Sequence, residues 1–98
     1  MYAIAAATSD KPVHPEIVHD DASVKIVVVT IAAGQTMKEH ATPVPVTVQT
    51  ISGAGMMKVS GEDHPLTADK VHFLDAEAPH AIRADAGAPL VLLVHYLK

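Results

Sequence analysis

Two histidines, His40 and His80, are the residues of this sequence best placed to do chemistry. Each lies close to a proline, since Pro43 follows His40 by three positions and Pro79 immediately precedes His80. Imidazole is a common ligand of transition metals, and it is the side chain that titrates nearest to neutral pH. If the fold brings the two rings together, we expect a site that binds a small molecule, a divalent metal, or both.

A third histidine, His72, has two interpretations that the sequence leaves open. It lies in an apolar run, in step with Leu74 and out of step with Phe73. Because side chains alternate between the two faces of a strand, His72 either points inward with Leu74 or lies solvated on the outer face. In the first case it would be a third metal donor. The remaining histidines are interpreted as surface or core residues: His14, His19, His64 and His95.

Composition excludes several kinds of function. The chain has 98 residues and no cysteine, which excludes disulfides, thiolate metal sites and a cysteine nucleophile. Its formal net charge is −4 and it has no basic stretch, so nucleic acid is not an expected partner. The longest apolar run, residues 89–94, is too short to cross a bilayer, and we see no secretory signal. We therefore expect a cytoplasmic protein without a membrane partner.

The elements that would position these histidines are predicted to be strands. The candidate runs are rich in Val and Ile or alternate between apolar and polar residues, and Gly and Pro separate them. Such short, closely spaced strands predict an antiparallel sandwich or barrel. Pro12 and Pro15 predict an irregular stretch before Ile17, and residues 2–8 fit a helix or a strand. The predicted strands cover residues 23–33, 45–52, 56–60, 64–67, 71–74, 80–84 and 90–97.

The two histidine patterns resemble the two motifs of the cupin superfamily. In the first motif Gly34, His40 and Gly53 stand at the family's spacing, and in the second Gly61 matches the first glycine and His80 the histidine. The resemblance covers residues 22–97 and implies one cupin domain over residues 1–98, with residues 1–21 as an N-terminal extension. It implies an all-β fold, the cupin-type double-stranded β-helix, which is a jelly-roll-like antiparallel barrel.

Two departures from the family pattern concern its metal ligands. A typical cupin holds its metal with three histidines and one glutamate, but Thr42 stands at the second histidine position and Val46 at the glutamate position. Only His40 and His80 remain of that set, with His72 as the candidate replacement. The resemblance therefore implies a divalent transition metal (Zn, Ni, Fe or Mn) less strongly than it implies the barrel, and a metal-free protein stays open.

Three function classes follow. The first is a small-molecule binding barrel, with His40 and His80 in a pocket lined by Met37, Thr42, Val46, Val48 and Ile82. The second is a metal-dependent enzyme of dioxygenase or isomerase type, with metal ligands His40, His80 and His72. The third is a metal-free structural or assembly domain. The small number of metal-ligating side chains favours small-molecule binding over metal catalysis. We also expect a homodimer, since pairing hides open sheet edges, with the apolar residues 2–8 lying across the partner.

Overall fold

The computed structural model describes residues 4, 6 and 11–98. The described residues form nine strands and no helix, and accordingly no helix that could span a membrane. The prediction of an all-β fold is confirmed. The strands are β1 (Val13–Asp20), β2 (Val24–Ile31), β3 (Thr36–His40), β4 (Val46–Ser52), β5 (Gly55–Val59), β6 (Glu62–Leu66), β7 (Val71–Leu74), β8 (His80–Ala84) and β9 (Leu90–Leu97).

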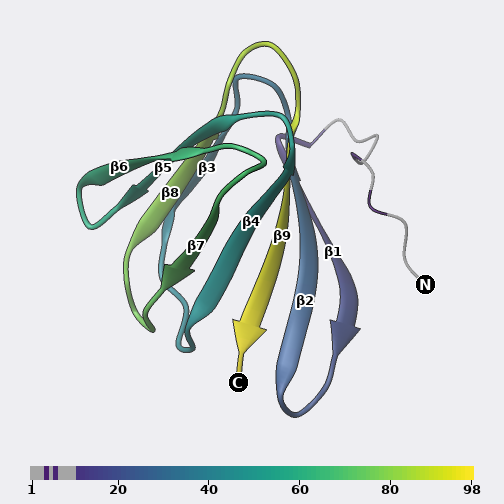
Figure 1. Cartoon of the computed structure of the whole chain (residues 1–98), viewed down its shortest axis with the longest axis vertical. Coiled ribbons are helices and arrows are strands. Elements are labelled where there is room, and N and C mark those ends of the chain that lie inside the picture. Colours follow the sequence, from purple (N-terminus) through teal and green to yellow (C-terminus); the bar gives the residue numbers. More distant parts are fainter. Residues whose placement is uncertain (1–3, 5, 7–10) are drawn as a thin grey trace.

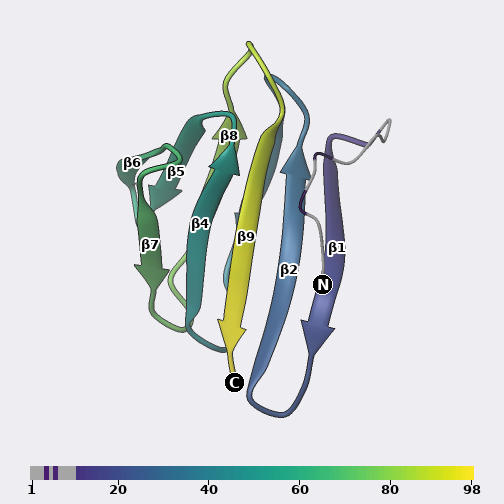
Figure 2. The ribbon, with the colours of Figure 1, turned by 45° about the vertical axis from the view of Figure 1, so that its right-hand side comes forward.

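The strands make two antiparallel sheets packed face to face (Figures 1 and 2). One sheet has five strands in the order β1-β2-β9-β4-β7, and the other has four in the order β3-β8-β5-β6. Strands distant in the chain become neighbours: the last strand, β9, lies between β2 and β4, and β8 lies between β3 and β5. This interleaving is the jelly-roll arrangement, and it places His40 of β3 beside His80 of β8.

The core lies between the sheets and is almost entirely aliphatic. Alternate residues of β2 and β9 face inward and pair across the ladder, as Val27 does with Val94 and Val29 with Leu92. Each fully buried aliphatic side chain contributes about 1.5–3 kcal/mol of transfer free energy. The sequence has three aromatic residues, and its core is built from Val, Ile and Leu with one Met and one Ala: Val27, Val29, Ile31, Val46, Val48, Met57, Leu66, Leu74, Ile82, Ala84, Leu90, Leu92 and Val94.

The prediction of an irregular stretch before Ile17 was wrong. Residues Val13–Asp20 form β1, which pairs with β2 in spite of Pro15, and a register shift falls between Ile17 and His19. The reason is position, because β1 is an edge strand and the missing N–H of a proline can face away from the ladder there. Part of the predicted N-terminal extension thus belongs to the five-stranded sheet.

Gly53 lets the chain pass from the five-stranded sheet to the four-stranded one. Its φ is +78°, in the left-handed region that favours glycine, and a Cβ at this position would collide with the carbonyl oxygen of Pro89. The turn it makes joins β4 to β5. The closing glycine of the first motif therefore has a structural role, because it connects the two walls that enclose the histidines.

Candidate functional site

The strand pairing between β3 and β8 sets His40 directly opposite His80. The ladder has a register shift between Met37 and His40, which is the position of a β-bulge. Bulges change the direction of a side chain and are frequent beside functional sites. The two ring centroids are 4.3 Å apart and the ring planes are tilted by 59°. The predicted meeting of the two imidazoles is thus observed, while what they bind stays a prediction.

Each ring is oriented by a backbone carbonyl two residues earlier in its own chain segment. Nδ1 of His80 lies 3.0 Å from the oxygen of Ala78, and Nδ1 of His40 lies 3.1 Å from the oxygen of Lys38. Since a carbonyl oxygen only accepts, the hydrogen of each bond must be on Nδ1. In a neutral ring this leaves Nε2 with a free lone pair. Histidines that bind metals are oriented in the same way, because the ring nitrogen that does not bind the metal donates to a carbonyl or carboxylate.

His80 is the buried member of the pair. It is 4% exposed, whereas His40 is exposed on the solvent side. Burial lowers the pKa of His80 below its usual value of 6.5, the bond to the Ala78 carbonyl partly opposes this, and the positive charge of a protonated His40 lowers the pKa further. The neutral form of His80, with its Nε2 lone pair available, is therefore favoured near neutral pH.

The pair lies in a cavity enclosed by both sheets. All seven residues predicted from the sequence to surround a ligand line it: Met37, His40, Thr42, Val46, Val48, His80 and Ile82. Sequence reasoning missed four further lining residues, which come from the two central strands β2 and β9: Val29, Leu92, Val94 and Tyr96. Their alternate positions in long apolar runs indicate that they face the core. Only the register of β2 with β9 places them at this cavity.

The cavity is small and mostly apolar. Its volume is about 40 Å³. One water requires roughly 10–15 Å³ by a comparable measure, and pockets for drug-sized ligands measure about 300–1,000 Å³. The hydroxyl of Thr42 donates to the carbonyl oxygen of Val44 at 2.8 Å, so it can offer a ligand only a lone pair. The cavity has room for a metal ion with one or two waters, or for one polar group of a larger molecule.

His72 does not join this pair. Its parity with Leu74 is as expected, since both are less exposed than Val71 and Phe73. However, its ring lies 5.9 Å from that of His64, and its Nε2 lies 3.2 Å from the carbonyl oxygen of Pro65. Among the described residues no three His, Asp or Glu side chains are grouped closely enough to hold a metal ion. Of the two orientations left open by the sequence, the structure shows the less exposed one, but at a position along the sheet where the ring of His72 lies beside His64.

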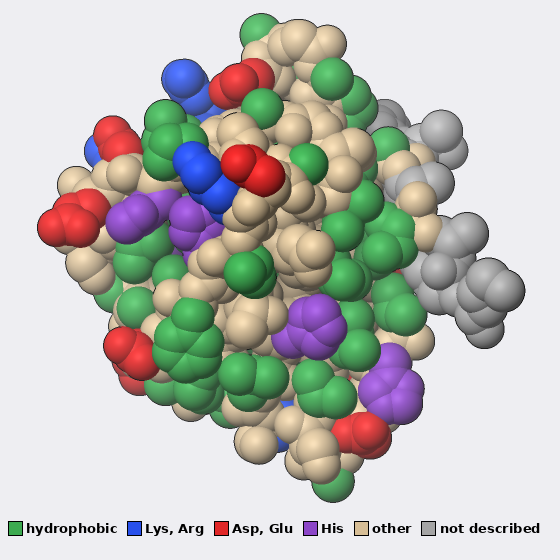
Figure 3. Space-filling view, in the orientation of Figure 1, with side chains coloured by type: hydrophobic (Ala, Val, Ile, Leu, Met, Phe, Trp, Pro, Cys, Tyr) green, Lys and Arg blue, Asp and Glu red, His purple; other side chains and the backbone are tan. Residues whose placement is uncertain are grey.

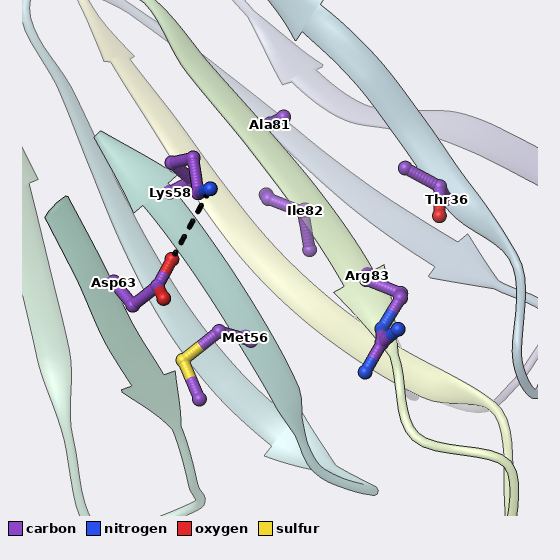
Figure 4. Close-up of a pocket in the computed structure, with 7 residues that line it drawn as sticks. All are labelled: Thr36, Met56, Lys58, Asp63, Ala81, Ile82 and Arg83. Atoms are coloured by element: carbon purple, nitrogen blue, oxygen red, sulfur yellow. Dashed lines mark ion pairs between the residues drawn. The ribbon is translucent and has the colours of Figure 1, made fainter. Parts of the chain in front are cut away.

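A second hollow lies on the outer surface of the four-stranded sheet (Figure 4). It measures about 350 Å³ and is crossed by the ion pair between Lys58 and Asp63, whose charged atoms are 3.9 Å apart. Both side chains are about 60% exposed, so solvent screens this pair. The hollow contains no histidine, and its charged side chains read as an ordinary solvated face. The histidine cavity is therefore the better candidate site.

Comparisons with known proteins agree with this fold. A family model described as a cupin domain matches residues 27–96. No curated protein is significantly similar in sequence. Among solved structures, a protein from Thermus thermophilus superposes with a TM-score of 0.84 at 22% identity over 95% of this chain and 90% of its own. A cupin superfamily protein from Desulfitobacterium hafniense gives a TM-score of 0.81 at 18% identity over 95% of this chain and 83% of its own.

A third similar structure carries the name of an enzyme. The DMSP lyase DddQ from Ruegeria pomeroyi superposes with a TM-score of 0.80 at 19% identity. The match covers 89% of this chain but 47% of the lyase, so the chain spans about half the length of that enzyme. At this identity the likeness shows a shared fold.

Proposed function

The chain belongs to the cupin domain family, and on that premise we propose that it is a small-molecule binding barrel whose His40–His80 pair receives one polar group of the ligand. The observation that carries the proposal is the orientation of the rings. Both Nδ1 atoms bond to backbone carbonyls, which leaves two Nε2 lone pairs beside an apolar cavity. His80 is 4% exposed, so its Nε2 acceptor has little access to water, and a ligand in the cavity would supply a donor.

A divalent transition metal is a second occupant that we propose for the same atoms. Two imidazoles fit half of a tetrahedral donor set, and water or the ligand would fill the other positions. A bound metal would supply Lewis acidity to whatever group it touches. Because Val46 and Thr42 offer no charged donor, we expect weak and exchangeable binding, and we favour no one of Zn, Ni, Fe and Mn.

The alternative of a metal-dependent enzyme is less well supported by this donor set. It relied on His72 as a third ligand, and the ring of His72 instead lies with His64. The third class, a metal-free structural domain, does not account for two oriented imidazoles beside a cavity. Donor count and ring orientation together therefore support binding as the first function to test.

The test uses protein purified without a nickel column, before and after treatment with a chelator. We expect less than one metal ion per chain, bound through His40 and His80, and we expect small polar fragments to shift the ring resonances of both histidines in NMR spectra of the chelated protein. The double variant His40→Ala, His80→Ala should lose both responses. If neither metals nor fragments affect those resonances in the wild-type protein, the binding proposal is refuted.

We further propose that the chain forms a homodimer through the outer face of its five-stranded sheet. The outward side chains of β7, β4, β9 and β2 include no Lys, Arg, Asp or Glu. Val71 is 65% and Phe73 is 59% exposed there. Figure 3 shows hydrophobic side chains gathered over the lower part of this face with few charges among them. Each copy carries a net charge of −4, and two copies that meet on such a face bring no like-charged side chains together.

The size of the uncharged face fits a modest interface. Four strands about 4.8 Å apart and about seven residues long give a flat footprint of at most roughly 450 Å² per copy, and less of it is available because Val28, Thr30 and Val91 on this face are already buried. Specific dimers bury about 800 Å² per partner. We therefore expect a dimer that dissociates on dilution. The segment 2–8, predicted to lie across the partner, falls outside the described residues except for Ile4 and Ala6.

Sedimentation over a range of concentrations tests the dimer. Phe73→Glu should give a monomer at concentrations where the wild-type chain is dimeric, while Met56→Glu, an exposed apolar residue of the other sheet, should leave the dimer unchanged. A wild-type chain that is monomeric at every concentration contradicts the proposal.

We propose in addition that residues 1–98 form a single domain and act in the cytoplasm. The single-domain proposal rests on one shared core between the two sheets. Limited proteolysis that yields one protected core, and fractionation of the source cells, would test these two statements separately.

A further inference from the structure

The histidine cavity adjoins a larger hollow at one end of the sandwich. This hollow, here called the vestibule, measures about 460 Å³ and is lined by Lys25, Thr42, Pro43, Val44, Tyr96 and Lys98. Thr42 and Tyr96 also line the histidine cavity, so they stand at the boundary between the two spaces. Figure 1 shows the loop between β3 and β4 and the end of β9 at this same end of the molecule.

The vestibule combines apolar walls with an ammonium group that has no acidic partner among the residues the structure describes. Nζ of Lys25 lies 4.5 Å from the ring centroid of Tyr96, where the aromatic face attracts it. Asp20 is opposite Lys25 in the β1–β2 ladder, but its carboxylate pairs with Lys98, which also bonds to the carbonyl oxygen of Asp21. Within the described residues, therefore, Lys98 is neutralised locally and Lys25 is not.

The histidine cavity has the opposite polarity. The backbone carbonyls occupy Nδ1 of His40 and of His80, so Nε2 of either ring in its uncharged form can only accept a hydrogen bond, as can the Thr42 hydroxyl, which donates to Val44. An anionic group is itself only an acceptor, so it finds no complement among these three atoms. A hydroxyl group can donate its hydrogen to one of these three acceptor atoms. The inner cavity thus favours a hydroxyl, and the vestibule favours an anion.

The volumes of the two spaces indicate where the body of the ligand would lie. The inner cavity, at about 40 Å³, admits one functional group, whereas the vestibule, at about 460 Å³, lies in the range of small-molecule pockets. Pro43, Val44 and the ring of Tyr96 would contact an apolar body. A molecule that satisfies both spaces has a hydroxyl at one end, a carboxylate at the other and an apolar body between them.

We propose that the ligand of this barrel is a hydroxycarboxylate, with its hydroxyl bound by His40 and His80 and its carboxylate bound by Lys25. The inference rests on the proposed binding function and adds the ligand class and the residue that selects it. Lys25 is then a specificity residue at the mouth of the site. Nothing in the local sequence around Lys25 reveals Tyr96 as its neighbour, because the two residues meet only through the register of β2 with β9.

The test is calorimetry of the chelator-treated full chain with matched probes. The hydroxycarboxylates are 4-hydroxybenzoate and 6-hydroxyhexanoate. The matched probes lack the hydroxyl (benzoate, hexanoate) or the carboxylate (phenol, 1-hexanol). We expect at least one hydroxycarboxylate to bind at least about tenfold more tightly than both of its matched probes, since two separated groups each contribute a charged or neutral hydrogen bond. Equal binding across each matched set, or no binding by any probe, overturns the proposal.

Variants of Lys25 separate this proposal from the binding function itself. Lys25→Met keeps the aliphatic stem against Tyr96 but removes the charge, and it should reduce hydroxycarboxylate affinity to that of the matched alcohol; Lys25→Arg should restore most of it. Lys58→Met, on the outer surface of the other sheet, is the control and should have no effect. If phenol shifts the His40 and His80 resonances but Lys25→Met changes nothing, the ligand class is wrong and the binding function stands. If hydroxycarboxylate binding depends on Lys25 but survives His40→Ala, His80→Ala, the histidine site itself is refuted.

Discussion

The molecule contains two pairs of neighbouring histidines, and only one of them is arranged as a binding site. The rings of His40 and His80 lie 4.3 Å apart and tilted by 59°, and those of His64 and His72 lie 5.9 Å apart and inclined by 64°. Ring separation and tilt do not by themselves distinguish the pairs. The difference lies in what each nitrogen bonds to and in what surrounds the rings.

In the first pair, Nδ1 of both rings is used by the protein and Nε2 of both rings is free. In the second pair, Nε2 of His72 is used, because it donates to the carbonyl oxygen of Pro65. The residues of that bond belong to the edge strands of the two sheets, β7 and β6. The second pair thus joins the sheets, whereas the first faces a cavity enclosed by them. In this protein, neighbouring histidines form a candidate site where the backbone holds Nδ1 of both rings and leaves Nε2 available.

The largest difference expected between the pairs is in metal affinity. Titration of the chelator-treated protein with Zn²⁺ should show that His40→Ala, His80→Ala lowers the affinity by at least about 100-fold. Removing only a group that hydrogen-bonds to a metal ligand already costs about 10–100-fold, and this double variant removes the ligands themselves. The matched double variant His64→Ala, His72→Ala should change it by less than about threefold. Equal losses in the two double variants would mean that the pairs share one metal and that the present separation of their roles is wrong.

Adding a carboxylate to the first pair should sharpen the contrast. Val46 lines the cavity at the position where the family pattern has glutamate, so Val46→Glu should raise Zn²⁺ affinity by about tenfold or more. The same change should lower the free energy of unfolding of the metal-free protein by about 3 kcal/mol or more, because it buries an unpaired charge. Gln49→Glu, on the exposed face of the same strand, is the control and should do neither. Thermal unfolding with and without Zn²⁺ measures both effects.

The pH dependence of stability should report the burial of His80. Its pKa is lowered in the folded protein, so the unfolded chain binds a proton more readily than the folded one. The neutral ring therefore stabilises the fold above the unfolded pKa of about 6.5, and that contribution is lost as the pH falls through the folded value. Urea unfolding of the metal-free protein between pH 8 and pH 5 should show this loss, and His80→Phe should reduce it. An unchanged pH profile in His80→Phe would exclude His80 as its source.

Sequence reasoning reached the fold and the inner site for the same physical reason. Alternation of apolar residues fixes which side of a strand faces the core, and the glycine and proline positions fix where strands end. The sequence therefore predicts that Met37, Val48 and Ile82 line the cavity, as they do. The same information put His72 on the same side of its strand as Leu74 but left open whether that residue faces inward, and the structure shows it on the less exposed side.

What could not be predicted depends on pairing between strands that are distant in the chain. Placing His72 beside His64 requires the β6 and β7 edges of two different sheets, and placing Lys25 over Tyr96 requires the register of β2 with β9. No local pattern encodes either contact. Pro15 misled for a related reason, since a proline is acceptable in β1 only because β1 is an edge strand.

The smallest effect we predict concerns the second pair alone, and it tests the structural role given to it. His72→Leu removes the donor to the Pro65 carbonyl but keeps an apolar side chain, and it should lower the free energy of unfolding by about 1 kcal/mol, the usual contribution of a partly exposed hydrogen bond. His72→Gln retains an N–H donor of similar reach and should recover part of that loss. Neither variant should alter the ring resonances of His40 and His80, because no ring contact or hydrogen bond found among the described residues joins the two pairs. Urea unfolding at pH 7.5, where His80 stays neutral, measures the difference. If His72→Leu is as stable as the wild-type chain, the bond between the sheet edges contributes nothing, and the second pair is merely a neighbouring pair of rings without a function in the fold.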